Sequence, residues 1–360
     1  MATMPREAAA AALPDLLRER ERRRRRNPLE FFVPHAKQLP FVTSKAPIRV
    51  FCAANRSGKT TIGVVEDLWW ALACHPYRTV PLSSRIWVVS LDFGVQKTVI
   101  QPKFQEWLPK GVCVVRNRST DTWGRLIFRC NRCKKMPREK LRGGHEDGSE
   151  LWWCSSCSRE VSIIEFKACE QGVDKFQGAD VDLIHNDEEP PDERIVEEER
   201  MRLVDRRGSM MFTFTPIKGM TWSHDALFKR DGEKEMDPVT KKQRALIEVF
   251  DASMYDNPHL PSGEATRAEA ACATEAQKRI RIFGEYHALS GLVLGMWNPA
   301  WNEVPKLPEE FLTEDGTLKP FDVYQGPYIV IGSDFTAGAA PYAMPVRNLG
   351  IKRLWLSSED

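Results

Sequence analysis

The segment from Phe51 to Thr61 reads Phe-Cys-Ala-Ala-Asn-Arg-Ser-Gly-Lys-Thr-Thr and constrains this chain more than any other segment. It fits the phosphate-binding loop pattern G-x-x-x-x-G-K-[ST], called Walker A, with Ala53 in place of the first glycine. Apolar residues precede it, and apolar residues at helical spacing follow it. The order strand, loop, helix predicts an α/β fold: a mainly parallel sheet with helices on both faces and the site at the carboxyl ends of the strands.

The loop predicts nucleotide chemistry. Backbone N–H groups of residues 55–60 can surround a phosphate at a helix N-terminus, where the helix dipole favours anions. Lys59 would reach the β- and γ-phosphate oxygens of ATP, and the Thr60 hydroxyl would hold Mg²⁺. The predicted nucleotide-binding residues are Ala53, Ala54, Asn55, Arg56, Ser57, Gly58, Lys59, Thr60 and Thr61. The alternative is a chance Gly-Lys-Thr in an ordinary loop.

Composition is that of a globular protein, with 42% apolar and 28% charged residues and a net charge of +2 over 360 residues. No run of 18 apolar residues predicts a membrane span, and no signal peptide is recognisable, so we expect a cytosolic protein with no membrane partner. Charge is uneven: residues 18–26 hold seven Arg, and residues 116–142 hold ten Lys or Arg against two acids. We expect residues 1–27 to form a mobile basic arm, either solvated or in contact with nucleic acid or a partner.

Four cysteines have the spacing of a metal site: Cys130 and Cys133, then Cys154 and Cys157 after a gap of 20 residues. Two C-x₂-C knuckles can place four thiolates around one structural Zn²⁺, which leaves no open position for water. The alternative is four reduced, uncoordinated thiols. The other five cysteines lie in apolar or helical settings and are predicted to be core residues: Cys52, Cys74, Cys113, Cys169 and Cys272.

The mostly apolar segment 181–186 ends in Asp187 and Glu188. At the carboxyl end of a strand, Asp187 can bind Mg²⁺ and Glu188 can deprotonate an attacking water, the roles of a Walker B motif. The alternative is an acidic helix start, and both can be true. Gln38, 21 residues before Lys59, can bond an adenine edge, although a surface role is as compatible with its spacing.

These motifs follow one another in a set order: Gln38, the phosphate-binding loop, Phe176-Gln177-Gly178, Asp187-Glu188-Glu189-Pro190, Thr213-Phe214-Thr215-Pro216 and Tyr255-Asp256-Asn257-Pro258. The set resembles the large terminase subunit of tailed bacteriophages. The resemblance implies a packaging ATPase followed by a ribonuclease-H-like nuclease domain. It also implies a homo-oligomeric ring at the portal protein of an empty capsid in the host cytoplasm, which translocates double-stranded DNA, cuts concatemers and works with a small terminase subunit.

Carried over by the resemblance, Lys59 and Thr60 hold phosphate and Mg²⁺, Asp187 is the acid beside the metal and Glu188 is the catalytic base. Arg56 would couple the γ-phosphate to movement, and Thr215 would belong to the coupling motif. Three departures stand out. The four-cysteine insertion interrupts the strand region, no arginine is assigned to act in trans, and few residues follow Asp334, the expected first acid of the nuclease site.

The expected organisation is a basic arm at 1–27, an ATPase domain at 28–290 with a zinc-ribbon insertion at about 129–160, a linker at 291–326 and the start of a nuclease-like domain at 327–360. Because a two-metal nuclease needs several acids, the chain is expected to lack nuclease activity. Two other functions remain open: a helicase- or remodeller-like ATPase with a zinc module, and a zinc-bearing adaptor whose phosphate-binding loop is vestigial.

Overall fold

The computed structural model describes residues 6–135, 139–140, 152–154, 156–287, 303–304 and 356–357. The chain divides into two compact units, Met1–Leu289 and Ser290–Asp360. In the second unit the described residues are two short strands, β14 (Glu303–Val304) and β15 (Leu356–Ser357), which pair in parallel. Asp334 and the segment that begins at Tyr328 lie outside the described residues.

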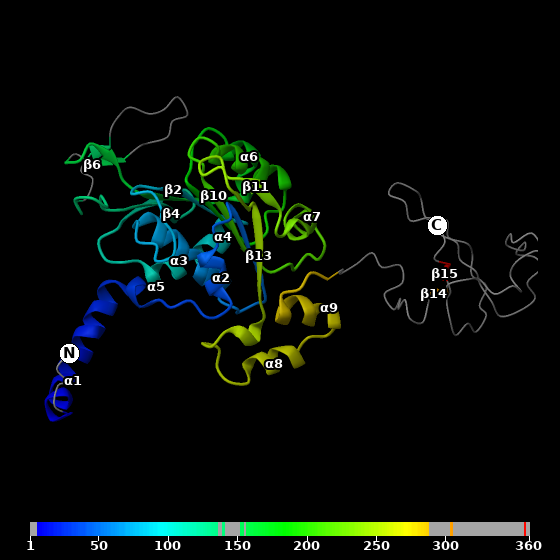
Figure 1. The fold of residues 1–360 in the computed structure, drawn as a ribbon, viewed down its shortest axis with the longest axis horizontal. Helices are drawn as coiled ribbons and strands as arrows, with labels where there is room; N and C mark the ends of the chain where they lie inside the picture. The colour runs from blue at the N-terminus through cyan, green and yellow to red at the C-terminus, as the bar shows by residue number, and fades with distance from the viewer. Residues whose placement is uncertain are drawn as a thin grey trace, which may run out of the picture. The chain divides into compact units, whose positions relative to one another are not determined.

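An eight-stranded sheet organises the first unit (Figure 1). Its order is β13 (Ile247–Ala252), β1 (Ile48–Ala53), β10 (Ser209–Phe214), β9 (Leu183–Asp187), β2 (Arg85–Ser90), β8 (Ile163–Ala168), β4 (Thr122–Ile127) and β3 (Cys113–Asn117). The strands from β13 to β8 run parallel, and β4 and β3 form an antiparallel hairpin at one edge. The predicted mainly parallel sheet is confirmed.

Two apolar cores cover the two faces of this sheet, because successive strand residues point to opposite sides. From β1, Phe51 and Ala53 join the core under α3 (Lys59–Ala71) and α5 (Gln101–Trp107). Val50 and Cys52 point the other way, toward α6 (Glu193–Leu203). Continuous apolar runs in β1, β2 and β10 are what a strand covered on both faces requires. The prediction of helices on both faces is therefore confirmed.

The remaining elements are short, apart from α1. The other helices are α1 (Arg6–Arg26), α2 (Gln38–Thr43), α4 (Phe93–Val95), α7 (Trp222–Ala226), α8 (Glu264–Ala270) and α9 (Glu275–Lys278), and a π-helical turn, η7 (Arg279–Phe283), follows α9. A hairpin of β11 (Lys234–Met236) and β12 (Gln243–Ala245) precedes β13, and β5 (Glu139–Lys140), β6 (Trp152–Cys154) and β7 (Arg159–Glu160) form a small sheet between β4 and β8. No helix of the described residues is long and apolar enough to cross a membrane.

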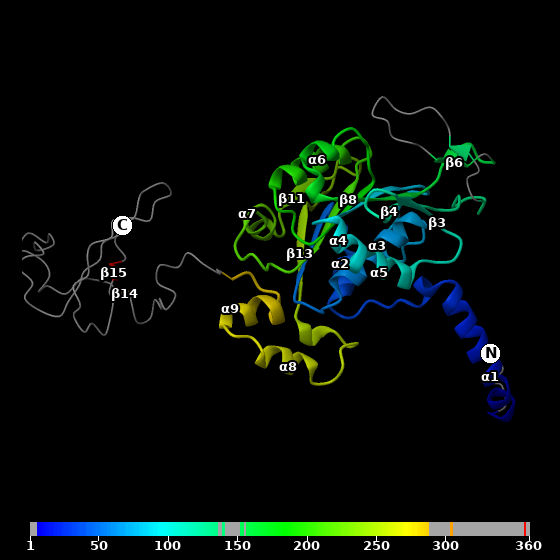
Figure 2. The same ribbon diagram turned by 180° about the vertical axis from the view of Figure 1, so that it is seen from behind.

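Three local features differ from what the sequence patterns suggest. Residues 6–26 of the expected mobile arm form one helix, since Ala, Leu, Arg and Glu favour helices and Glu–Arg pairs such as Glu21–Arg25 lie one turn apart. The segment from Ala265 to Phe283 has a helical composition, but it is divided into α8, α9 and η7, with Thr274 capping α9. Both α8 and α9 lie together beyond the end of β13 in the front and rear views (Figure 2).

The third difference is that the prediction of five core cysteines was only partly correct. Cys52 and Cys169 are buried, but Cys74 and Cys113 are exposed and Cys272 is half-buried. Cys74 lies just beyond the end of α3, and Cys113 begins the edge strand β3, where one neighbouring strand is missing.

Candidate functional site

The phosphate-binding loop connects β1 to α3 and makes a sharp turn at its end. Gly58 has a φ of 90°, in the left-handed region that favours glycine, and the first helical residue is Lys59. The Ser57 hydroxyl donates to the Ala54 carbonyl at 2.7 Å and closes the loop on itself. The N-terminus of α3 thus faces the space above the carboxyl end of β1, as an anion site requires.

Residues before β1 support the loop from one side. The Gln38 amide donates to the Gly58 carbonyl at 3.1 Å and accepts from the backbone N–H of His35 at 3.1 Å. His35 Nε2 lies 3.0 Å from the Ser57 carbonyl oxygen. Gln38 is buried, and a methyl group on Gly58 would lie 2.8 Å from its Nε2 atom. In this structure the Gln38 amide binds the loop backbone.

Residues far along the chain support the loop from the other side, and sequence reasoning missed most of them. The backbone N–H of Ala54 donates to Ala252 at 2.8 Å, and that of Asn55 donates to Arg281 at 2.9 Å. A methyl group on Gly284 would lie 2.5 Å from the Ala54 nitrogen, so only glycine fits there. These contacts use the N–H groups of Ala54 and Asn55, and the Ser57 N–H donates to the Ala54 carbonyl at 3.4 Å.

Among the residues that support the loop from this side, Asn257 belongs to a motif named in the sequence analysis, Tyr255-Asp256-Asn257-Pro258. Its side-chain amide donates to the Arg56 carbonyl at 2.6 Å. Arg56 itself has a φ of 60° and an exposed side chain. The Arg56 guanidinium therefore lies at the surface, on a loop whose backbone is held in place.

Lys59 and Thr60 meet the two predicted acids. The Thr60 hydroxyl lies 3.4 Å from the Asp187 carboxylate, 127 residues away in sequence, and Lys59 Nζ lies 3.5 Å from the Glu188 carboxylate. The sheet order explains this convergence. A single strand, β10, separates β1 from β9, and all three are parallel, so their carboxyl ends lie side by side.

Glu188 has an unusual backbone and environment. Its φ is 73°, a conformation that costs a non-glycine residue about 1–3 kcal/mol and is found preferentially at functional sites. Its N–H donates to the Thr213 carbonyl at 3.0 Å, which holds the strained residue in place. Burial raises the pKa of Glu188, against the opposing effect of Lys59, so this carboxylate is a stronger base than an exposed one.

Thr215 lies between the loop and Glu188. Its hydroxyl donates to the Ala53 carbonyl at 2.7 Å, and its backbone N–H donates to the Glu188 carboxylate at 3.3 Å. Any shift of the loop against Glu188 therefore changes a contact of Thr215. Of the other predicted loop residues, Ala53 is buried at the end of β1 and Thr61 lies in the first turn of α3.

A buried chain of hydrogen bonds holds Asp187 from behind. Its second carboxylate oxygen accepts from the Thr213 hydroxyl at 2.7 Å. His185 Nε2 lies 2.8 Å from the same hydroxyl, and His185 Nδ1 lies 2.7 Å from the carboxylate of Asp67 inside α3. This histidine fits only because Gly63 faces it: a methyl group there would lie 2.3 Å from the imidazole. Sequence reasoning missed this chain, whose only sequence signal is a polar His and Asn inside an apolar strand.

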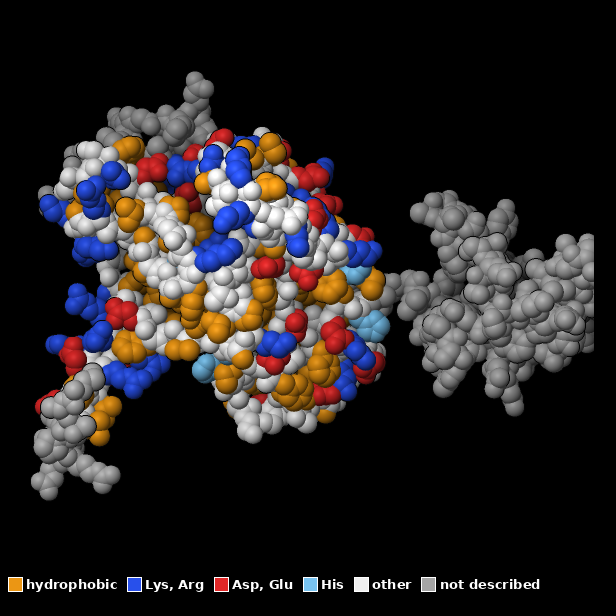
Figure 3. All heavy atoms as spheres, in the orientation of Figure 1, with side chains coloured by type: hydrophobic (Ala, Val, Ile, Leu, Met, Phe, Trp, Pro, Cys, Tyr) orange, Lys and Arg blue, Asp and Glu red, His pale blue; other side chains and the backbone are white. Residues whose placement is uncertain are grey.

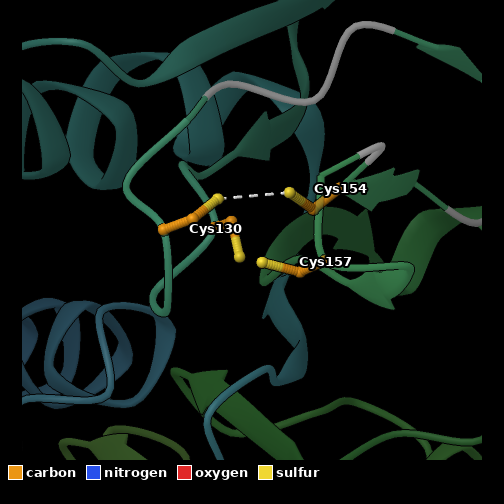
Figure 4. A group of neighbouring side chains, drawn as sticks. Cys130, Cys154 and Cys157 are labelled. Atoms are coloured by element: carbon orange, nitrogen blue, oxygen red, sulfur yellow. Dashed lines mark hydrogen bonds between the residues drawn. The ribbon is translucent and has the colours of Figure 1, made fainter.

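The four cysteines converge at the other end of the sheet. Their sulfur atoms all lie within 4.8 Å of one another, and those of Cys133 and Cys154 are 3.3 Å apart. Figure 4 shows the sulfurs of Cys130, Cys154 and Cys157 pointing toward a common centre. Four thiolates 2.3 Å from one tetrahedral zinc would be about 3.8 Å apart, so the group can hold a metal ion of this kind.

Hydrogen bonds within the cysteine group change the pKa values of Cys133 and Cys157. A backbone hydrogen bond from Lys135 and the nearby thiols lower the pKa of Cys133 to about 7, whereas the hydrogen bond with Cys133 raises the pKa of Cys157 to about 12.

Asn131, inside the first knuckle, donates to the carbonyls of Ala71 at 2.9 Å and Leu82 at 2.8 Å. The knuckle is thereby fastened to the end of α3.

Comparisons with known proteins find similarity in structure alone. No protein-family model matches the chain, and no curated protein matches it in sequence. The ATPase domain of the Thermus phage P74-26 large terminase matches with a TM-score of 0.49 and 19% identity, over 72% of this chain and 96% of that one. The large terminase of another thermophilic bacteriophage, in complex with ADP, matches with a TM-score of 0.48 and 14% identity, over 76% of this chain and 58% of that one. Both of these matches are to large terminases of phages, at TM-scores below 0.5 and identities below 20%.

Proposed function

We propose that this chain hydrolyses ATP and that it is the motor of a phage terminase, which translocates double-stranded DNA into a capsid. The observation that carries the ATPase proposal is the convergence of Thr60 with Asp187 and of Lys59 with Glu188. A lysine, a hydroxyl and two acids at the N-terminus of a helix are the parts that phosphoryl transfer to water needs. The order of the sequence motifs supports the terminase assignment.

Each residue has a role in this proposal. Lys59 binds the phosphate oxygens, and Thr60 and Asp187 hold Mg²⁺, which neutralises phosphate charge when bound. The Thr213 hydroxyl donates to Oδ1 of Asp187 and so keeps this carboxylate in one orientation, with Oδ2 turned toward Thr60. Glu188 takes a proton from the water that attacks the γ-phosphorus, as the bond to the leaving ADP oxygen breaks.

The pair formed by Lys59 and Glu188 suggests how activity is switched on. The Lys59 ammonium forms an ion pair with Glu188 and lowers its pKa, against the effect of burial. A bound γ-phosphate competes for this ammonium, which leaves Glu188 free to accept a proton. Thr215 contacts both the end of β1 and Glu188, so it is the residue we propose to transmit this change.

The proposed partners follow from the terminase assignment: double-stranded DNA, a portal protein, a small terminase subunit and further copies of this chain in a ring, in the host cytoplasm. We also propose that the four cysteines hold one structural Zn²⁺. An exposed Arg56 on the phosphate-binding loop is available to act on a γ-phosphate or a neighbouring copy.

The decisive experiment measures ATP hydrolysis by the purified chain with and without linear double-stranded DNA. Magnesium-dependent turnover that rises with DNA is the expected result. No turnover under either condition would overturn the ATPase proposal and favour the adaptor alternative. Separation of the strands of a forked DNA, without movement along a blunt duplex, would favour the helicase-like alternative.

A further inference from the structure

A cleft of about 830 Å³ lies between the end of α1 and the first cysteine knuckle. It is lined by Arg22, Arg25, Arg26, Lys110, Gly111, Arg129 and Lys134, so every lining side chain apart from the glycine is a cation. Figure 3 shows Lys and Arg side chains gathered where α1 meets the body of the molecule. The net charge of the whole chain is +2, so this concentration is local.

Three separate segments line the cleft, and hydrogen bonds join them. The backbone N–H of Lys110 donates to the carbonyl of Arg26, the last residue of α1, at 3.1 Å. The guanidinium of Arg129 donates to the Gly111 carbonyl at 3.3 Å and packs so closely that a methyl group on Gly111 would lie 2.8 Å from it. These hydrogen bonds therefore fix the backbone from which the cations of the cleft extend.

Most of this charge is not neutralised inside the protein. Arg22 and Arg25 form exposed pairs with Glu19 and Glu21 on α1, and such pairs contribute little. Among the described residues, no carboxylate forms an ion pair with the four other cations, which are Arg26, Lys110, Arg129 and Lys134. Six like charges around one hollow repel one another, and a bound polyanion relieves that repulsion.

The lining also indicates which polyanion fits. A groove for a protein segment needs apolar or aromatic anchors, and a groove for single strands needs aromatic side chains on which bases stack. The lining residues include neither. Contacts made by charge alone are those that proteins make to the phosphate backbone of a duplex, independent of its sequence.

The cysteine knuckles determine the positions of two of the residues that line the cleft. Arg129 directly precedes Cys130, and Lys134 directly follows Cys133. The Lys134 backbone N–H donates to the Cys130 carbonyl at 2.7 Å, and Lys134 has a φ of 61°, so the fold of the knuckle sets where its side chain begins. A metal held by the four thiols would fix both cations.

The cleft is separate from the nucleotide site. Ile127 at the end of β4 pairs with Ile163, the first residue of β8, so Arg129 lies near the amino ends of the parallel strands. Asp187 ends β9 at the carboxyl end of the same sheet. A six-residue strand is about 20 Å long, which puts the two sites at opposite ends of the strands.

We propose that this basic cleft binds the phosphate backbone of duplex DNA and that metal binding by the cysteine knuckles sets two of its six cations in place. The proposal deepens the proposed function, because it names the surface by which the motor contacts its DNA. It would stand as a DNA site even if the chain proved not to hydrolyse ATP.

The test uses the full chain and a fluorescent duplex of about 30 base pairs, with no ATP, over a range of salt concentrations. The variant Arg129→Gln/Lys134→Gln removes two cations beside the knuckle, and Arg26→Gln/Lys110→Gln removes two from the far wall. The matched control is Lys241→Gln/Lys242→Gln, two exposed lysines in the turn between β11 and β12. Thermal melting of each variant checks that it folds.

Each lost phosphate contact lowers the slope of log affinity against log salt by about 0.9, so each cleft variant should lower the slope by about 1.8. Between 200 and 50 mM salt this difference corresponds to a change of roughly 10-fold in relative affinity. A chelator that removes the metal should weaken wild-type binding but weaken the Arg129→Gln/Lys134→Gln variant much less. ATP turnover without DNA should be the same in all these variants.

Three results would overturn the proposal. One is that the control variant loses as much DNA affinity as the cleft variants, which would mean that binding depends on overall charge and not on the cleft. Another is unchanged DNA binding in both cleft variants. The third is unchanged DNA binding with lost binding of poly-glutamate, which would make the cleft a site for an acidic protein segment. Loss of turnover with intact DNA binding would instead bear on the proposed ATPase alone.

Discussion

The two ends of the parallel sheet carry sites of opposite character. At the carboxyl end, Thr60, Asp187, Thr213 and His185 are joined by hydrogen bonds between side chains, and each of these four has a partner within the chain. At the amino end, four sulfur atoms lie within 4.8 Å of one another, and thiolates this close repel one another. Contacts within the chain organise the first site, whereas we propose that a bound cation completes the second. The difference predicts that the two ends respond differently to mutation.

The largest effect is expected from Glu188→Gln at the carboxyl end. Glutamine keeps the shape of the side chain but cannot take a proton, so turnover should fall roughly 10²–10⁴-fold while ATP still binds. Single-turnover hydrolysis and nucleotide binding measure the two parts separately. Turnover close to that of the wild type would remove Glu188 from the role of base.

Next comes Lys59→Ala, which removes the ammonium from both the phosphate and Glu188. We expect a loss of roughly 10²–10³-fold in turnover, as for the loss of one preorganised donor in other enzymes. ATP affinity should fall as well, which distinguishes this variant from Glu188→Gln. Lys241→Ala, on an exposed turn, is the control and should leave both unchanged. The assignment fails if Lys59→Ala behaves like this control.

At the amino end, Cys130→Ser/Cys157→Ser should lower bound zinc from about one ion per chain to near zero. Stability should fall by about 3 kcal/mol, because loss of a structural metal belongs to the large-effect mutations. Metal analysis and denaturant unfolding measure the two effects, with exposed Cys74→Ser as the control. Zinc content that stays unchanged in the double variant would rule out this metal site.

Gly63→Ala tests how rigid the carboxyl end is. The added methyl group would lie 2.3 Å from the His185 imidazole, so the histidine or the helix must move. We expect a destabilisation of about 2 kcal/mol, together with a higher Mg²⁺ requirement for turnover as Thr213 and Asp187 lose their support. In the control Gly124→Ala the new methyl group would lie 3.6 Å from its nearest neighbour. Equal melting temperatures for the two variants would show that the packing around His185 is not tight.

The smallest effect is expected at Glu199 on α6, which accepts a hydrogen bond from Asn186, beside Asp187. Burial raises the pKa of Glu199 to about 8, above its ordinary value of 4.5. The folded state therefore binds more protons than the unfolded state between these values, and stability falls as pH rises through this range. Compared with Glu199→Gln, the wild type should therefore lose stability between pH 5 and pH 8. Urea unfolding at the two pH values measures this, and parallel curves would contradict it.

Patterns local in sequence predicted what depends on local chemistry. The strand, loop and helix around Lys59 follow from apolar periodicity and from the glycine before the helix, and the knuckles follow from cysteine spacing. Asp187 and Glu188 could be placed near Lys59, because parallel strands bring their carboxyl ends to one edge. The break between α8 and α9 could not be predicted, since it depends on a cap at Thr274 within an otherwise helical composition.

The sequence by itself determined the class of fold, the pair of cysteine knuckles and the residues that meet at the carboxyl ends of β1 and β9. Only the tertiary structure decided what supports them: Gly284 and Arg281 against Ala54 and Asn55, and Gly63 against His185. The physical reason is that these contacts join segments more than 100 residues apart. They depend on groups that must fit together to within a few tenths of an ångström, and no pattern in the sequence marks these groups.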